Sequence, residues 1–258
     1  MRHPYLEVEH PIALAHRGGG DPRLENTWKA FREAVALGYG YLETDAWCTA
    51  DGQVVLFHDE NLDRVSDRTG RIGDLSYAEV ARARIGGTEQ IPLLADVLAE
   101  WPGVRLNIDL KCDAVVEPFV RVIEKFNAQD RICIASFSDD RILRADGLLT
   151  GRACLSAGRG TVTRLRVASA IQGMAAPPLR FRPDVVQVPV RVGRVPIATP
   201  AFIRRMQHWG IAVHCWTVND TAGMERLLDL GIDGLVSDAT ADLKTVLLSR
   251  AQWPTSTE

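Results

Sequence analysis

The sequence predicts a (β/α)8 TIM barrel, a closed parallel barrel whose eight strands alternate with helices, and three observations support this fold. Short apolar runs that suit buried strands alternate with amphipathic segments along most of the chain. Polar residues repeatedly follow the apolar runs, where the loops of such a barrel gather an active site. The length, 258 residues, is close to the size of about 250 residues typical of this fold. We expect one domain over residues 1–258, with a small insertion after the second strand.

The first strand and helix set the pattern for the rest of the chain. An apolar run from Ile12 to Ala15 ends in a glycine-rich loop, and Asn26-Thr27 then precede an amphipathic segment from Trp28 to Leu37 that Gly38 closes. We expect the other seven strands at Tyr41 to Ala46, Val104 to Asp109, Ile132 to Ala135, Ala153 to Ser156, Val185 to Val188, Ala212 to Trp216 and Gly234 to Val236. Helices are expected between them, near Val115 to Phe126, Asp139 to Ala145, Thr161 to Gln172, Pro200 to Trp209, Thr221 to Leu230 and Ala241 to Leu248.

One section, about residues 51 to 94, interrupts this alternation. It carries many charges and turn formers where a single helix would otherwise follow the second strand. We expect a small excursion above the barrel rim, with a short helix from Tyr77 to Arg84 and a crossover helix near Leu93 to Trp101. The polar tail from Gln252 to Glu258 is expected to fray.

Composition excludes several classes of protein. The hydrophobic share of 46% and the charged share of 24% are ordinary for a globular domain, and the net charge of -3 argues against a nucleic-acid partner. The beginning of the chain lacks the pattern of a signal peptide, and no stretch suits stable membrane insertion, so we expect a cytoplasmic protein. The five cysteines are odd in number and never closely paired in sequence, which indicates buried thiols. Nothing in the sequence predicts the oligomeric state.

Two acidic residues on the second expected strand suggest a site. Glu43 and Asp45 are two residues apart, so the strand period places both carboxylates on one face. Holding two anions against a packed interior costs several kcal/mol unless a cation, a proton or a water-filled cavity compensates them. A pair of carboxylates hydrogen-bonded to the backbone is the alternative, and this stretch alone does not separate the two.

Further polar residues stand at corresponding positions near the ends of other runs. A lone strand-end histidine is more often structural than catalytic, but the set as a whole is suited to chemistry on a phosphate. Three carboxylates offer oxygen ligands to Mg²⁺ or Ca²⁺, two cations suit a phosphate anion, and two histidines suit one proton removal and one proton donation. The residues concerned are His16, Arg17, Glu43, Asp45, His58, Asp109 and Lys111, with Ser136, Phe137, Gln187, Trp216 and Asp238 at the remaining strand ends.

Taken together, the motifs at these positions resemble those of the glycerophosphodiester phosphodiesterase family. They run in family order over nearly the whole chain: AHRG at 15–18, ENT at 25–27, ETD at 43–45, TADGQVVLFHD at 49–59 with RTG at 68–70, NIDLK at 107–111, SF at 136–137, WTVN at 216–219 and GIDGLVSD at 231–238. The resemblance implies a barrel with a small insertion after its second strand. It also implies a metal-dependent phosphodiesterase of lipid and glycerol metabolism that hydrolyses glycerophosphodiesters to sn-glycerol 3-phosphate and an alcohol.

The resemblance also implies roles for individual residues. His16 and His58 would form the acid and base pair, and we favour His16 as the base, although the reverse assignment stays open. Attack by the glycerol 2-hydroxyl would give a cyclic phosphate, which water then opens. One divalent metal ion, Mg²⁺ or Ca²⁺, would be bound by Glu43, Asp45 and Asp109, the phosphate by Arg17 and Lys111, and the glycerol by Trp216. The family usually has Glu where this chain has Asp109, which puts metal affinity in question.

Other functions remain open at this point. A lysophospholipase D type activity would need an apolar groove for one acyl chain, and the section from Ile72 to Leu94 carries many charges for such a groove. A Trp216 that serves only as a core aromatic at a strand end is as acceptable as one that contacts glycerol. A non-catalytic barrel that binds a phosphate ligand would be expected to lack a histidine or an acid, and this sequence keeps all of them. A metal-free enzyme of the same barrel type would not need three carboxylates.

Overall fold

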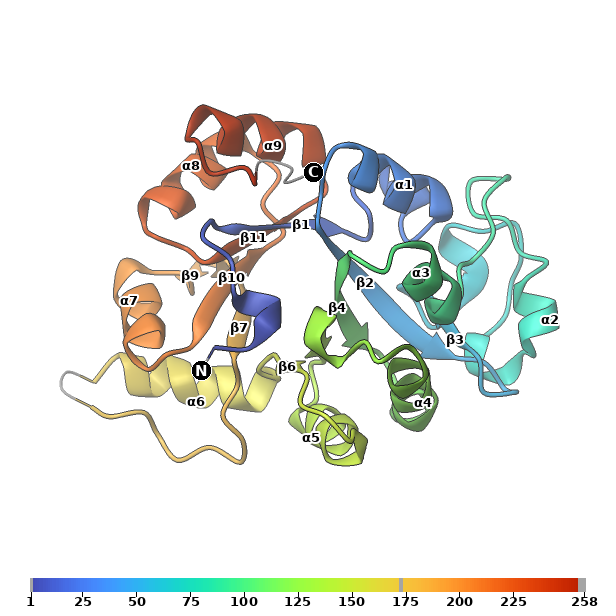
Figure 1. Cartoon of the computed structure of the whole chain (residues 1–258), viewed down its shortest axis with the longest axis horizontal. Helices are drawn as coiled ribbons and strands as arrows, with labels where there is room; N and C mark the ends of the chain where they lie inside the picture. The colour runs from blue at the N-terminus through green and yellow to red at the C-terminus, as the bar shows by residue number, and fades with distance from the viewer. Residues whose placement is uncertain (1, 172–173, 255–258) are drawn as a thin grey trace.

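Eight parallel strands form the barrel in the computed structural model, which describes residues 2–171 and 174–254 (Figure 1). The strands follow the order β6-β5-β4-β2-β1-β11-β10-β7, and a parallel bridge between Ser156 and Val185 joins the two end strands. The predicted (β/α)8 barrel is therefore confirmed. The strands are β1 (Ile12–His16), β2 (Tyr41–Cys48), β4 (Arg105–Leu110), β5 (Ile132–Ala135), β6 (Cys154–Leu155), β7 (Val185–Pro189), β10 (Ala212–Trp216) and β11 (Gly234–Ser237).

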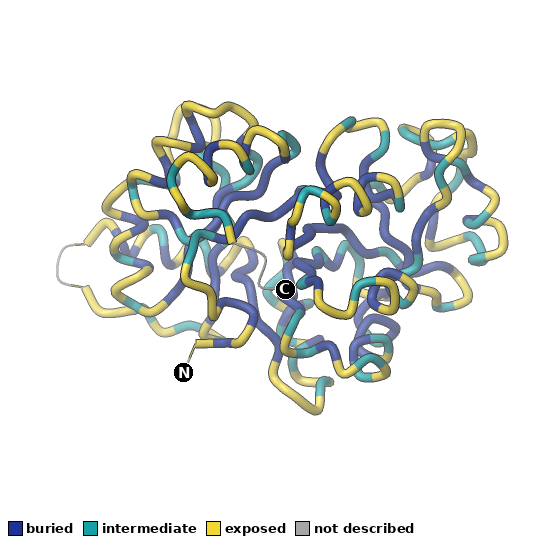
Figure 2. The backbone as a smooth tube through the Cα atoms, turned by 45° about the horizontal axis from the view of Figure 1, so that its top comes forward, coloured by how far each residue is buried: buried dark blue, intermediate teal, exposed yellow. Residues whose placement is uncertain are grey.

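Helices surround the strands, and their apolar faces pack on the outside of the barrel (Figures 1 and 2). Many begin at a side chain that accepts a backbone N–H, such as Thr27, Ser138, Thr199 and Asp220. The outer helices are α1 (Trp28–Ala36), α3 (Leu94–Glu100), α4 (Val116–Phe126), α5 (Asp139–Leu148), α6 (Arg159–Ser169), α7 (Pro200–His208), α8 (Thr221–Asp229) and α9 (Thr240–Ser249).

Several predicted boundaries are wrong. The helix expected from Thr161 to Gln172 is α6, which begins two residues earlier and ends at Ser169, and Gln172 itself lies outside the described residues. The strand expected from Ala153 to Ser156 is reduced to two residues in β6. Part of the tail that was expected to fray is packed, because Trp253 contacts Tyr39 edge to face at 5.0 Å between ring centroids. Residues 255–258 of that tail lie outside the described residues.

The insertion folds beside the second strand around a small apolar cluster of its own (Figure 1). The apolar run before His58 forms β3 (Val54–Leu56), which pairs antiparallel with the end of β2. Two short 3-10 helices, η3 (Leu62–Arg64) and η4 (Ile72–Asp74), follow it. The helix expected from Tyr77 to Arg84 is only α2 (Tyr77–Val80), because a capping box at Ser76 starts it but the chain then turns. A second small hairpin, β8 (Arg191–Val192) with β9 (Val195–Pro196), was not predicted.

The amino-terminal segment closes one end of the barrel. Its 3-10 helix η1 (Pro4–Leu6) buries Tyr5 and Leu6 against Leu14, Cys133 and Ala212, which point into the barrel. The Tyr41 hydroxyl donates to the Tyr5 carbonyl at 2.7 Å. The opposite end, where the strands terminate at their carboxyl ends, therefore offers the accessible mouth of the barrel.

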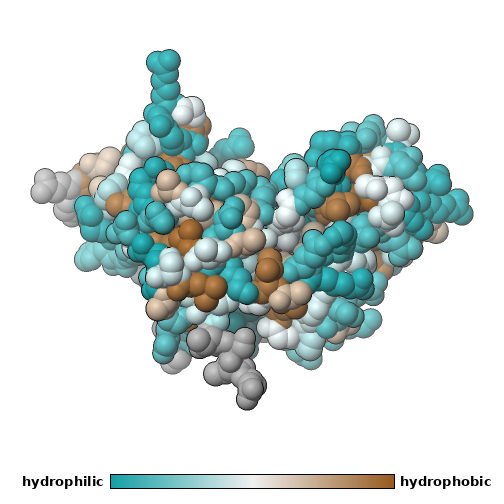
Figure 3. Space-filling model, turned by 90° about the horizontal axis from the view of Figure 1, so that it is seen from above, coloured by the Kyte–Doolittle hydropathy of each residue, from teal (hydrophilic) through white to brown (hydrophobic). Residues whose placement is uncertain are grey.

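Figure 3 shows hydrophobic residues in small separate patches among hydrophilic ones on the face that it displays. In the described ranges, 2–171 and 174–254, no helix combines the length and the apolar character needed to cross a bilayer.

The barrel interior contains polar side chains below the mouth. The Asn107 and Gln187 amides, on β4 and β7, donate to each other's oxygens at 3.3 and 3.0 Å. His214, the register partner of Gln187 on β10, is 0% exposed, and neither ring nitrogen has a hydrogen-bond partner among the described residues. Burial lowers the pKa of His214 to about 4, although Asp233 opposes the shift and Arg2 adds to it. The interior therefore stabilises neutral His214.

We predict that His214 makes the fold sensitive to acid. Its pKa is lower in the folded than in the unfolded chain, so its contribution is complete above about pH 6.5 and declines as pH falls toward 4, by roughly 3 kcal/mol in total. His214→Phe keeps a ring and removes the titration, so this variant should lose less stability than the wild type over that range. Denaturant unfolding followed by circular dichroism between pH 4 and 8 measures the difference. The exposed His208→Gln serves as the control, and parallel pH profiles for wild type and His214→Phe would contradict the prediction.

Candidate active site

The loop after β1 places two of the predicted site residues at the mouth. Arg17 has a left-handed backbone with φ of 52°, and Gly18 follows it with φ of 88°. A Cβ atom on Gly18 would lie 2.7 Å from Cβ of Ala30, so only glycine lets this loop pack directly on α1. The tight turn leaves His16 at the end of β1 and aims Arg17 across the neighbouring strand toward Asp45.

The second strand supplies the two predicted carboxylates on one face. Glu43 and Asp45 are 7% and 2% exposed. Cations compensate the negative charges of Asp45 and of Asp109, its neighbour on β4. The Asp45 carboxylate lies 3.2 Å from Nε of Arg17 and 2.7 Å from Nζ of Lys111. Asp109, the register partner of Asp45, binds the same Lys111 ammonium at 2.8 Å. Glu43 instead accepts the backbone N–H of Arg17 at 3.1 Å.

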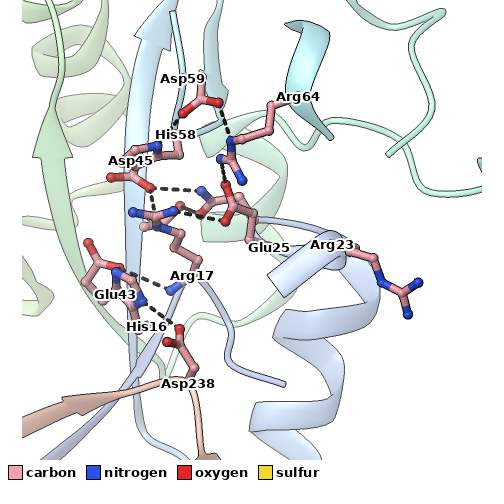
Figure 4. A network of polar contacts seen from close by, with 12 residues as sticks. His16, Arg17, Arg23, Glu25, Glu43, Asp45, His58, Asp59, Arg64 and Asp238 are labelled. Atoms are coloured by element: carbon pink, nitrogen blue, oxygen red, sulfur yellow. Dashed lines mark hydrogen bonds and ion pairs between the residues drawn. The ribbon is translucent and has the colours of Figure 1, made fainter. Parts of the chain in front are cut away.

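His16 and His58 each form a hydrogen bond with a carboxylate through Nδ1 (Figure 4). His16 Nδ1 is 2.6 Å from Asp238 at the end of β11, and His58 Nδ1 is 2.5 Å from Asp59. A carboxylate on Nδ1 holds the proton there, which leaves Nε2 free to accept or donate a proton toward a substrate. Nε2 of His16 faces Glu43 at 3.9 Å.

Burial and charge shift the pKa values of these groups in different directions. Burial raises the pKa of Glu43 to about 7, and the nearby Asp45 adds to this rise. Burial would also raise the pKa of Asp45, but Lys111 and Arg17 outweigh it and the pKa is lowered. For His16, burial lowers the pKa, yet Glu43 and Asp238 together outweigh it and the net shift is upward. Burial lowers the pKa of Lys111, but Asp45 and Asp109 stabilise its charged form more strongly. The pKa of Lys111 therefore rises to about 12.

A further carboxylate, Glu25, connects the two histidine regions. It accepts Arg17 Nη1 at 2.9 Å and also binds Arg64 of the insertion, whose guanidinium reaches Asp59 as well (Figure 4). Asn26, with φ of 56°, donates its amide to Asp45 at 2.9 Å and accepts from the Thr44 hydroxyl. Sequence reasoning assigned no role to Glu25, Arg64 or Asn26. The ENT motif at 25–27 was the available signal for two of them, while nothing marked Arg64.

Two aromatic side chains, Trp216 and Phe137, also lie at the mouth of the barrel. Trp216, at the end of β10, meets Phe137 edge to face at 6.2 Å between ring centroids. Phe137 is 53% exposed, and the Arg159 guanidinium lies over its ring. An exposed aromatic next to a half-buried one gives the mouth an apolar contact surface for carbon atoms of a ligand. Trp216 is therefore half-buried at the mouth and also packs against the apolar cluster inside the barrel.

The three predicted metal ligands match a hard cation in chemical type and lie on neighbouring strands. In the described part of the chain, however, no three His, Cys, Asp or Glu side chains are arranged to hold an ion. The Lys111 ammonium lies between Asp45 and Asp109 and occupies the space between these two carboxylates. The donor set fits Mg²⁺ or Ca²⁺ in kind, because all three side chains offer carboxylate oxygens. Metal binding stays a prediction.

Comparison with proteins of known sequence finds relatives along nearly the entire chain. A Mycobacterium tuberculosis protein named "probable glycerophosphodiester phosphodiesterase 2" is 41% identical over 245 residues, which cover 94% of this chain and 92% of that protein. A human lysophospholipase D is 27% identical over 91% of this chain and 85% of its own length.

Solved structures share the fold. A Silicibacter pomeroyi protein superposes with a TM-score of 0.79 at 18% identity over 98% of this chain and 100% of its own. An Oleispira antarctica phosphodiesterase, solved in complex with the product sn-glycerol-3-phosphate, gives a TM-score of 0.74 at 21% identity, covering 92% and 97% of the two chains.

A family model decides the assignment that the site geometry and these relatives suggest. The model described as "Glycerophosphoryl diester phosphodiesterase family" matches residues 16–242, a span that begins at His16 and includes every predicted site residue. The predicted family and its enzyme class are thereby confirmed. The chain belongs to the glycerophosphoryl diester phosphodiesterase family.

Proposed function

We propose that this protein hydrolyses glycerophosphodiesters to sn-glycerol 3-phosphate and an alcohol. The observation that carries this proposal is the pair of histidine–carboxylate contacts at the barrel mouth, on either side of a cluster of buried carboxylates and cations. The name of the Mycobacterium tuberculosis relative and the product bound to the Oleispira antarctica enzyme support the same substrate class.

The two histidines would transfer the protons of the reaction. We propose that Nε2 of His16 removes the proton of the glycerol 2-hydroxyl as its oxygen bonds to phosphorus, and that Nε2 of His58 protonates the departing alcohol oxygen. A cyclic phosphate results, and water opens it with the two proton transfers reversed. Asp238 and Asp59 would hold each imidazole in one orientation and stabilise its charged form.

The cations and the two aromatic side chains would position the substrate. Arg17 offers a planar guanidinium and Lys111 a compact ammonium, and both lie beside Asp45 at the mouth, where they would contact the phosphate oxygens. Trp216 and Phe137 would contact the glycerol carbons. These contacts would align the 2-hydroxyl with the phosphorus, which lowers the entropic part of the barrier.

We further propose that Glu43, Asp45 and Asp109 bind one divalent ion, Mg²⁺ or Ca²⁺. Such an ion supplies charge stabilisation to the phosphoryl oxygens. Lys111 would then shift from bridging the two aspartates to the substrate phosphate, which its single flexible chain permits. Asp109 reaches less far than the usual Glu, so we expect weaker ion binding than in relatives that have Glu.

A lysophospholipase D activity is the second candidate. The human relative of that name and the exposed Phe137 beside Trp216 favour it, because an acyl chain needs an apolar surface at the mouth.

A cytoplasmic location is part of the proposal and agrees with five free cysteines, four of them buried.

The proposed reaction is tested by a substrate panel with and without a chelator. We expect the purified protein with Mg²⁺ or Ca²⁺ to release sn-glycerol 3-phosphate from at least one of several glycerophosphodiesters, measured by an enzyme-coupled assay. Chelation should lower this rate at least a hundredfold, because the buried acids would lose their cation. Product from a lysophospholipid alone would favour the second candidate. Absence of product from every diester would refute the proposed function, and full activity in chelator would refute the metal proposal.

Replacement of either histidine should abolish turnover. We expect His16→Ala and His58→Ala to lower kcat by at least a thousandfold, since each removes one proton transfer, while the circular dichroism spectrum stays unchanged. His208→Ala, on the outer helix α7, is the matched control and should retain wild-type rates. A wild-type rate in either site variant would exclude that histidine from catalysis.

Asp238 should act as a positioning residue for His16. Asp238→Asn keeps the size of the side chain but removes the negative charge on His16 Nδ1, and we expect kcat to fall tenfold to a hundredfold with little change in KM. Asp242→Asn on α9 provides a control of the same chemistry away from the site. A change confined to KM, or to the thermal midpoint, would instead show that Asp238 has no effect on His16 during turnover.

A further inference from the structure

Four of the five cysteines fall into two pairs, one on neighbouring strands and the other at the end of β2 and just after β4. Cys133 and Cys154 are register partners on β5 and β6. On β2 and β4, Ala46 pairs with Leu110, and the Lys111 N–H donates to the Ala46 carbonyl at 3.1 Å. Continuing this register by two residues places Cys48 opposite Cys112. The cysteines are not closely paired in sequence, but the barrel places four of them in two separate spatial pairs.

The two pairs lie in different surroundings. Cys133 and Cys154 are 0% exposed and point into the barrel, which η1 closes. Cys48 and Cys112 instead face outward and both line a pocket of about 430 Å³ at the base of the insertion. Cys112 is half-buried and is the more accessible residue of the pair. Trp47, Glu60 and Arg71 also line this pocket.

The strand geometry suits a bond between the outward pair. Adjacent strands lie about 4.7–4.9 Å apart, which falls within the Cα separations of about 4.4–6.8 Å that disulfides span. Their side chains leave the sheet on the same face, because Cys48 and Cys112 continue the outward-facing series of Ala46 and Leu110. The Cys48 thiol donates to the Thr49 carbonyl at 3.3 Å, a weak contact that rotation about one side-chain bond releases.

We propose that Cys48 and Cys112 form a reversible modification site, a thiol pair that low-molecular-weight disulfides convert into an intramolecular disulfide. The Cys112 thiolate would attack one sulfur of the disulfide, release the first small thiol and form a mixed disulfide. The Cys48 sulfur, losing its proton to solvent, would then attack the Cys112 sulfur and release the second small thiol. Both protein thiols are oxidised in this sequence and one small disulfide is reduced.

The order of attack follows from burial. Cys48 is 6% exposed, and burial raises the pKa of its thiol, so it is a poor first nucleophile. Cys112 is the more accessible group and would react first. Once a mixed disulfide stands on Cys112, the neighbouring Cys48 needs no diffusion to displace it.

The bond would tie the end of β2 to the segment that directly follows β4. Cys48 is the last residue of β2 before the chain leaves for the insertion, and Cys112 directly follows Lys111. The closed loop would contain His58, Arg64 and the rest of the insertion. Closing so long a loop restricts the unfolded chain, and we expect the thermal midpoint to rise by about 5 °C or more.

Oxidised glutathione tests this proposal on the full chain. Reduced protein is incubated with oxidised glutathione at pH 8, free thiols are alkylated, and intact mass and peptide maps are recorded. We expect the wild type to lose two hydrogen atoms, to yield a linked Cys48–Cys112 peptide, and to keep Cys133 and Cys154 as thiols that react only after denaturation. Dithiothreitol should restore the starting mass. Because the readout is mass, failure here leaves the proposed hydrolysis untouched.

Variants separate the proposed route from other chemistry. Cys48→Ser should retain one glutathione on Cys112, whereas Cys112→Ser should gain none and form no bridge. Cys133→Ser is the matched control, since it removes one member of the other register pair and should form the Cys48–Cys112 bridge as the wild type does. Circular dichroism verifies that each variant is folded. The proposal is overturned if wild-type protein keeps reduced thiols, retains glutathione at Cys112, or links Cys133 to Cys154.

Discussion

The ion pairs of Lys111 with Asp45 and Asp109 are the interaction on which the site depends. Parallel pairing of β2 with β4 puts the two aspartates side by side, and mutual repulsion would otherwise destabilise both strands at their ends. Arg17 supplies the second cation, and the left-handed turn at Arg17 is what lets its guanidinium reach Asp45. The barrel mouth is therefore organised by charge compensation.

The fold could be predicted well because the barrel repeats a simple local rule. Each buried strand is a short apolar run, several outer helices begin at a capping side chain, and the alternation of strands and helices predicts a parallel sheet. Boundaries failed where tertiary contacts override the local pattern. Trp253 has no partner in the sequence around it, yet it packs on Tyr39, which is more than two hundred residues away. The β8–β9 hairpin is exposed and lacks the hydrophobic alternation that marks a strand.

The site was predictable in its chemistry and less so in its connections. Strand ends converge in a barrel, so His16, Glu43 and Asp109 could be grouped without knowing any distance. The strand period predicted that Glu43 and Asp45 share one face. Only the structure shows that the Asp45 carboxylate is contacted by the side chains of Asn26, Arg17 and Lys111. The role of Asp238 depends on β1 and β11 being neighbours, and that of Arg64 on how the insertion folds back. Such long-range choices leave no periodic signal in the sequence.

The insertion reaches the barrel mouth because of how it is attached. β3 pairs antiparallel with the end of β2, the strand that holds Glu43 and Asp45, and His58 follows β3 directly. The Trp47 indole donates to the His58 carbonyl at 3.1 Å, and Arg64 spans from Asp59 to Glu25 on the other side. His58 is thus held from β2 and from the segment before α1, although its own segment lies outside the barrel. The position of the second histidine therefore depends on how firmly the insertion stays against β2, and the pocket containing Cys48 and Cys112 lies at that junction.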